Sequence, residues 1–309
     1  MSATNVLYDP PGPRAKRRNV LYTVLFIGAL GLVAWWVLGA LNDKGQLAAD
    51  KWTPFVTDSK VWTTYLLPGL VETLKAAALS IVIALPLGAV LGIGRLSDHR
   101  WVRVPAGAVV EFFRAIPVLL LMLFANAAYI LAEVDSEIRP LYAVVTGLVL
   151  YNASVIAEIV RAGVLTLPYG QTDAAKAIGM RKGQIMVNVL LPQAVTAMLP
   201  ALVSQLVVIV KDTALGGAML NFPELLSQNR QITANYGANT IAAFTVIALI
   251  FIALNFLLTT LAGWLEGRVR RAKKGTGAVV GGAAGDDLGG GGIVIPAQAS
   301  ASDTADSAG

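Results

Sequence analysis

The chain has 309 residues, of which 56% are hydrophobic and 14% are charged, and its mean hydropathy is +0.66. These values exclude an ordinary soluble domain, in which about 25% of the residues are charged. Cysteine is absent, which excludes disulfides, thiolate nucleophiles and cysteine-based metal sites. We therefore expect an integral membrane protein.

Six segments are predicted to cross the membrane as helices, since a span needs about 20 predominantly apolar residues. They cover approximately residues 20–41, 66–94, 112–133, 140–160, 194–215 and 240–264. None has the alternating ten-residue pattern of a membrane β-barrel, so the predicted fold class is an all-α integral membrane protein with about six transmembrane helices. The first apolar run exceeds the roughly 7–15 residues of a signal-peptide core, so it is interpreted as a retained anchor.

Basic residues flank every second loop, before the first span and after the second, fourth and sixth. They are Arg14, Lys16, Arg17, Arg18, Arg95, Arg100, Arg103, Arg161, Lys176, Arg181, Lys182, Arg268, Arg270, Arg271, Lys273 and Lys274. The positive-inside rule then predicts that both termini are cytoplasmic, with the 42–65, 134–139 and 216–239 loops outside. Because topology explains the net charge of +5, no nucleic-acid partner is expected.

The composition divides the chain into four parts. Residues 1–19 contain three prolines beside the basic cluster and are predicted to be a disordered cytoplasmic leader. Residues 20–65 form the anchor helix and an external loop, and residues 66–265 form the main transmembrane domain. Residues 275–309 are rich in Gly, Ala, Ser and Asp and are predicted to be a disordered cytoplasmic tail.

No catalytic machinery is predicted. The tail's glycine-rich run lacks the Gly-Lys-Ser/Thr ending of a phosphate loop, and no such sequence occurs elsewhere, so this chain is not expected to hydrolyse ATP by that route. Nucleophile-elbow and zinc-protease motifs are also absent. We expect no catalytic residue, no metal site and no cofactor bound by this chain.

Burying an ionisable residue in the membrane costs free energy unless the residue is paired or hydrated. Glu158 and Arg161 are three residues apart at the cytoplasmic end of the fourth span, which predicts a structural pair, and Glu111 and Arg114 repeat the spacing. A third group closes the fifth span on the external side: Lys211, Asp212 and Thr213. These residues either extend to the interface or line a translocation path or gate, and the sequence leaves both open.

The polar interruption at 161–192 is predicted to be cytoplasmic. Thr172 or Asp173 can cap a short helix with a small apolar face, Gly179 supplies a turn, and an amphipathic segment leads into the fifth span. Small residues permit close approach of another protein, although a helix-turn-helix lying on lipid headgroups is the alternative. The residues predicted to make a protein contact are Asp173, Ala174, Ala175, Ile178, Gly179, Leu191 and Pro192.

The spacing of this loop resembles the cytoplasmic EAA signature of ABC importer permeases, in which EAA is followed by G and by an LP pair. Asp173 replaces the usual Glu, which retains the charge with a shorter reach. Further segments resemble the polar-amino-acid (histidine and glutamate) branch, so that the likeness covers about residues 66–265. They are 69–70, 73–74, 114–117, 158–163, 168–171 and 210–213.

The resemblance implies a type I ABC importer-like permease in a bacterial cell membrane, which imports a polar amino acid such as glutamate or a related acidic or amide amino acid. It implies two cytoplasmic ATP-binding subunits that use ATP and Mg²⁺, an extracytoplasmic amino-acid-binding protein and a second permease subunit. The alternatives are a secondary amino-acid transporter driven by an ion gradient, for which no internal repeat or mid-span carboxylate is found, and a non-transporting scaffold or receptor subunit.

Overall fold

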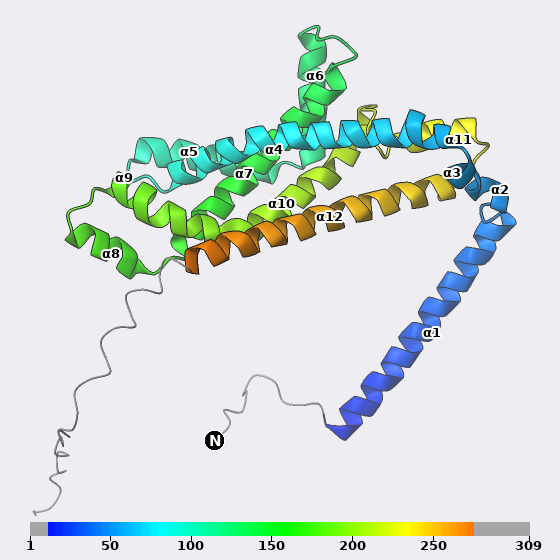
Figure 1. Ribbon diagram of the computed structural model, residues 1–309, viewed down its shortest axis with the longest axis horizontal. Coiled ribbons are helices and arrows are strands. Elements are labelled where there is room, and N and C mark those ends of the chain that lie inside the picture. The colour runs from blue at the N-terminus through cyan, green and yellow to red at the C-terminus, as the bar shows by residue number, and fades with distance from the viewer. Residues whose placement is uncertain (1–11, 275–309) are drawn as a thin grey trace, which may run out of the picture. The chain divides into compact units, whose positions relative to one another are not determined.

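The computed structural model describes the backbone of residues 12–274, and its regular secondary structure over that range is helical (Figure 1). Its helices are α1 (Pro13–Asp43), α2 (Ala49–Trp52), α3 (Pro54–Thr57), α4 (Leu67–Arg95), α5 (Arg100–Ala115), α6 (Val118–Leu131), α7 (Arg139–Leu165), α8 (Tyr169–Ala177), α9 (Lys182–Ile185), α10 (Leu191–Met219), α11 (Gln228–Asn235) and α12 (Thr240–Lys274). Two π-helical segments, η1 (Val61–Leu66) and η2 (Met186–Leu190), run directly into α4 and α10. All contacts described below lie within residues 12–266.

Five helical stretches in the described residues are long and apolar enough to cross a membrane, and the bent pair α5 and α6 raises the number to six. The five are Pro13–Asp43, Val61–Arg95, Arg139–Leu165, Lys182–Met219 and Thr240–Trp264. This confirms the prediction of an all-α membrane protein with about six spans.

The predicted span at 112–133 is not one helix. α5 ends at Ala115, α6 begins at Val118, and the two are bent by 100° relative to each other. Pro117 causes the break, because its ring holds Ile116 in extended conformation (φ −95°, ψ 129°) and it has no backbone N–H to continue the helix. α6 alone has 14 residues, or about 21 Å, which is shorter than the roughly 30 Å hydrocarbon core.

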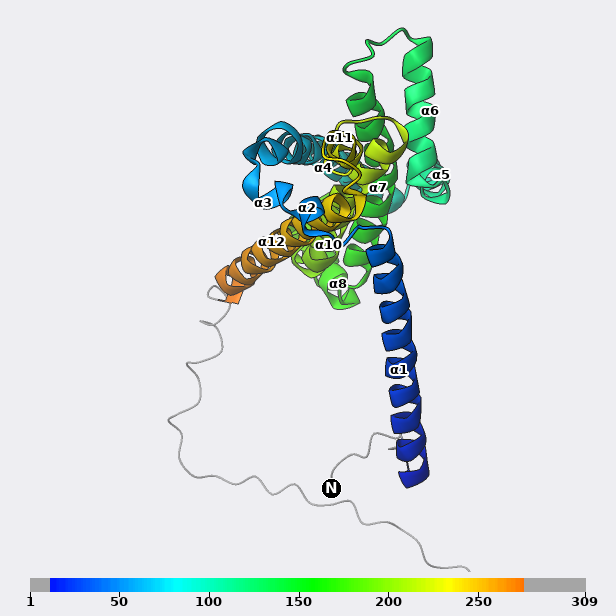
Figure 2. The same cartoon turned by 90° about the vertical axis from the view of Figure 1, so that its right-hand side faces the viewer.

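The centre of the bundle is α7, which packs against α4, α5, α6 and α10. α6 lies beside α7 in both views (Figures 1 and 2). The packing is close at glycines: a Cβ atom on Gly88 of α4 would lie 2.8 Å from the carbonyl oxygen of Ala153, and one on Gly92 would lie 2.7 Å from that of Ala157. Glycine at these positions therefore lets the backbones of α4 and α7 approach each other.

Two predicted boundaries differ from the structure. Residues 13–19, expected to belong to a disordered leader, form the first turns of α1, where Pro13 occupies a position that tolerates its missing N–H. α10 continues to Met219, beyond the predicted end of the fifth span at 215. The remainder of the leader and the predicted tail at 275–309 lie outside the described residues.

The connection between α10 and α11 is fixed by a buried carboxylate. Glu224 accepts hydrogen bonds from the backbone N–H groups of Leu226 and Ser227, each at 2.7 Å, and burial raises its pKa to about 7. The Leu225 N–H donates to Thr73 Oγ1 of α4 at 3.1 Å. This connection is therefore held against the start of α4, at the opposite end of α10 from α8 and α9 (Figure 1).

Candidate coupling site

The polar loop between α7 and α10 folds as the predicted helix-turn-helix. α8 ends at Ala177, and Gly179 follows in the left-handed region with φ 81°. Its N–H donates to the Lys176 carbonyl at 2.9 Å, and the Met180 N–H donates to the Ala175 carbonyl at 3.1 Å. These bonds satisfy carbonyls at the helix end, which confirms the predicted glycine turn.

The start of α8 differs from the prediction. The helix begins at Tyr169 after Pro168, so Thr172 and Asp173 lie inside it rather than at its cap. Pro168 is held extended (φ −58°, ψ 132°), and its ring removes an N–H that a preceding turn would need. Asp173 pairs instead with Lys176 at 3.5 Å, with both side chains exposed.

The predicted apolar face is divided by the fold. Ala175 is 5% exposed and faces the protein, whereas Ile178 is 78% exposed and Ala174 is also exposed. Ala174 and Ile178 are four residues apart and therefore share the outer face of this turn. An exposed isoleucine beside a small residue offers a partner a contact surface, while Ala175 anchors α8. Leu191 and Pro192 lie at the first turn of α10, half-buried and exposed respectively.

The loop is braced against neighbouring segments. Lys182 of α9 donates to the carbonyl of Leu96 at 3.1 Å and pairs with Asp98 in the connection between α4 and α5. The hydrogen bond from Lys182 lowers the pKa of Asp98 below its ordinary value. Gln193 of α10 donates to the side-chain oxygen of Gln171 in α8 at 3.3 Å. The loop is therefore linked by side-chain contacts both to α10 and to the end of α4.

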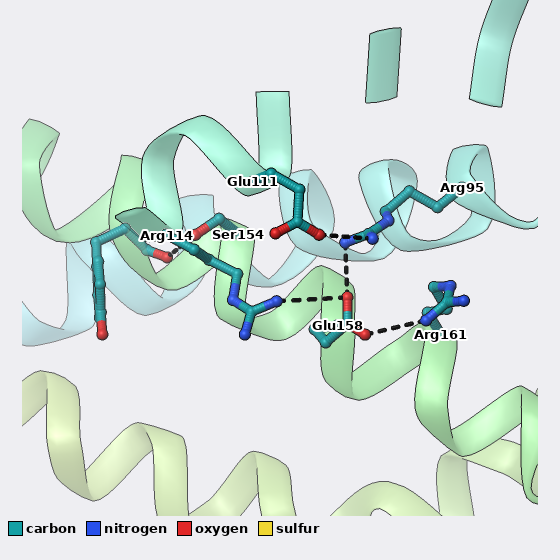
Figure 3. A network of polar contacts seen from close by, with 7 residues as sticks. Arg95, Glu111, Arg114, Ser154, Glu158 and Arg161 are labelled. Atoms are coloured by element: carbon teal, nitrogen blue, oxygen red, sulfur yellow. Dashed lines mark hydrogen bonds and ion pairs between the residues drawn. The ribbon is translucent and has the colours of Figure 1, made fainter. Parts of the chain in front are cut away.

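An ionic network adjoins this end of α4 (Figure 3). Glu158 of α7 lies 2.6 Å from Arg95 of α4, 3.1 Å from Arg161 and 3.6 Å from Arg114 of α5. Arg95 also reaches Glu111 of α5 at 2.9 Å. The network therefore ties α4, α5 and α7 together. Arg95 directly precedes Leu96, whose carbonyl accepts the hydrogen bond from Lys182.

Sequence spacing found only part of this network. The Glu158–Arg161 pair is confirmed. Glu111 and Arg114, which have the same spacing, pair with Arg95 and Glu158 rather than with each other. The key residue missed was Arg95, whose side chain is 13% exposed. Nothing local signals its role, because its partners are 16 and 63 residues away.

Glu158→Gln is expected to lower the free energy of unfolding of the membrane-inserted protein by about 1–2 kcal/mol. Three arginines would lose a charged partner, which is itself part-exposed. Melting in nanodiscs measures this effect. Glu111→Gln is the comparison, since Glu111 contacts one arginine and its side chain is 62% exposed. An equal or larger loss for Glu111→Gln would contradict the central role of Glu158.

The structure does not gather Lys211, Asp212 and Thr213 into one site. They lie two turns inside α10 rather than at its end, and consecutive helix residues point in different directions. Thr213 is fully buried and donates to the carbonyl of Val210 at 2.8 Å. Lys211 lines an otherwise largely apolar groove of about 670 Å³ with Asn255 of α12, and Asp212 is half-buried.

Residues 84–271 match the family described as "Binding-protein-dependent transport system inner membrane component". The chain is 49% identical over 237 residues to the glutamate transport system permease protein GluD of Corynebacterium glutamicum, which covers 76% of this chain and 86% of that protein. It is 37% identical over 158 residues to the glutamate/aspartate import permease protein GltK of Escherichia coli O157:H7, over 49% of this chain and 70% of that one. A solved amino acid ABC transporter chain superposes with a TM-score of 0.61 and 26% identity, over 67% of this chain and 95% of that chain. The chain is therefore a multi-pass membrane protein that belongs to the family of binding-protein-dependent transport system inner membrane components.

Proposed function

We propose that this chain is a permease subunit of an ATP-driven importer for polar amino acids, with glutamate or a related acidic or amide amino acid as substrate. The observation that carries the proposal is the helix-turn-helix of α8 and α9, which presents Ile178 outward while Lys182 and Gln193 brace it to the helix ends. The likeness to GluD, a glutamate permease by its name, supports the substrate class.

In this proposal the energy comes from partners. Two cytoplasmic subunits bind and hydrolyse ATP with Mg²⁺, and this chain binds no cofactor. An extracytoplasmic binding protein delivers the amino acid, and a second permease, either identical or different, completes the pathway. α8 docks on the ATPase, and its movement reaches α4 and α10 through Lys182 and Gln193.

Uptake by a reconstituted complex tests the function. The chain is co-expressed with its candidate ATPase, binding protein and permease partners, and labelled glutamate, glutamine and histidine are offered to proteoliposomes with ATP inside or outside. We expect glutamate uptake only with ATP on the ATPase side, unaffected by ionophores. Uptake that requires an ion gradient and no ATPase would instead establish a secondary transporter.

The proposed location is a bacterial cell membrane with both termini in the cytoplasm. The absence of cysteine makes this testable in intact cells with an impermeant thiol reagent. Single cysteines at Lys51 and Gln231 are expected to react, and one at the exposed His99 is expected to react only after permeabilisation. If only the cysteine at position 99 were labelled in intact cells, the chain would have the opposite orientation in the membrane.

A further inference from the structure

A polar pocket of about 400 Å³ lies at the end of the bundle away from α8, between the connection from α6 to α7 and the segment from Asn221 to Gln231. Its wall contains one carboxylate, Glu137, one guanidinium, Arg230, and two carboxamides, Asn221 and Gln231, beside serine hydroxyls and proline rings. The volume falls in the roughly 300–1,000 Å³ range of small-molecule pockets.

The two charged groups are open to a ligand. Arg230 Nη2 donates to the carbonyls of Ala218 at 3.3 Å and Gly217 at 3.5 Å, and within the described residues the guanidinium has no carboxylate partner. The Glu137 carboxylate accepts no hydrogen bond from any described side chain. Opposite charges therefore line one pocket without forming an ion pair with each other.

The wall is held in place before any ligand arrives. Asn221 has φ 57°, a left-handed conformation that asparagine tolerates better than most residues. Glu224 holds the backbone of Leu226 and Ser227, and its side chain fills the space where a Cβ on Gly217 would lie. A wall fixed in this way limits the ordering that binding requires.

We infer that this pocket binds a free polar α-amino acid, with Arg230 holding its carboxylate and Glu137 its ammonium group. A guanidinium binds a carboxylate with two parallel hydrogen bonds, and the carboxamides of Asn221 and Gln231 can bond an acidic or amide side chain. The pocket therefore has the complementary charges of a zwitterion.

Occupancy of the pocket is linked to α10. The carbonyls that Arg230 bonds are in the last turn of α10, the helix whose first turn follows the proposed coupling loop. A carboxylate on Arg230 therefore contacts the group that caps this helix. The inference deepens the proposed function, on which its choice of amino acid rests.

Cysteine protection tests the pocket in the full chain in nanodiscs, where both faces are accessible and no partner is needed. Gln231→Cys is labelled by a thiol reagent with and without L-glutamate, and Asn235→Cys, exposed on α11 outside the pocket, is the matched control. We expect glutamate to slow labelling at 231 but not at 235. Arg230→Gln is expected to weaken the protection by roughly tenfold or more, and Arg230→Lys by less.

Glu137→Gln gives a second readout, since its exposed side chain has no contact whose loss would unfold the protein. Glutarate lacks the ammonium group of glutamate. We expect glutamate to protect better than glutarate in the parent and equally well in Glu137→Gln. Absence of protection by glutamate in the parent overturns the inference, as does protection in Arg230→Gln and Glu137→Gln that equals the parental protection.

The two proposals fail in different ways. Protection in nanodiscs without ATP-driven uptake by the complex would contradict the proposed function but support amino-acid binding in the pocket. ATP-driven uptake by the complex, together with no protection of Gln231→Cys by glutamate, would support the proposed function and contradict amino-acid binding in the pocket. Lys60→Gln removes an exposed cation outside the pocket and is expected to leave both measurements unchanged.

Discussion

A Gly179→Trp variant is expected to insert and fold as the parent does but to lose most of its ATP-driven uptake. Gly179 adopts φ 81°, where a side chain costs about 1–2 kcal/mol, and no atom lies within 4 Å of a Cβ placed there. The added ring would therefore point into open space beside the outer face of Ala174 and Ile178, where the ATPase is proposed to dock. Uptake and stimulated ATP hydrolysis in the reconstituted complex are the measurements.

Matched variants separate docking from local strain. Gly183→Trp adds the same ring to the same loop at a position without positive φ and with open space, so it is expected to retain more activity. Gly179→Asn tolerates the left-handed conformation with a small side chain and is expected to remain active. Equal loss in Gly183→Trp would mean that bulk anywhere in the loop is harmful.

Asp173 gives an independent test of the same surface. Asp173→Glu restores the residue usual in the EAA signature and is expected to be nearly silent. Asp173→Lys replaces the exposed pair with Lys176 by two like charges and is expected to impair coupling. If both Gly179→Trp and Asp173→Lys retained parental uptake, the coupling role of this loop would have to be abandoned.

A Gly147→Ala variant is expected to destabilise the bundle strongly although it adds one methyl group. The new Cβ would lie 2.7 Å from the backbone nitrogen of Met122 and 2.9 Å from its Cα, so α6 and α7 would have to separate. Overpacking of this kind costs about 1–3 kcal/mol, and more where backbone must move. Because each kcal/mol corresponds to about 2–4 °C, the melting temperature in nanodiscs should fall by several degrees.

Gly107→Ala is the matched control for this prediction. Its Cβ would meet no atom within 4 Å in α5, and alanine is favoured over glycine in a helix by about 1 kcal/mol. We expect this variant to melt at or slightly above the parental temperature. A Gly147→Ala protein as stable as Gly107→Ala would show that α6 and α7 do not pack as closely as described.

The sequence by itself determined the membrane class, the approximate spans, the glycine turn and the Glu158–Arg161 pair. These features depend on local properties: hydropathy summed over about 20 residues, a left-handed position that glycine fills, and side chains three residues apart on one helix. The break at Pro117 also has a local cause, because proline restricts the residue before it and has no N–H to continue the helix.

Only the tertiary structure decided which residues meet across the bundle. Arg95 joins Glu111 and Glu158, Lys182 joins Asp98, and Glu137 shares a pocket with Arg230, although each set is scattered along the chain. Helix packing brings them together, because α7 at the centre fixes the rotation and height of its neighbours, and close glycine contacts leave little freedom in either. Charge spacing along one helix carries no information about that rotation, which is why Glu111 and Arg114 were paired with each other from the sequence and with other partners in the fold.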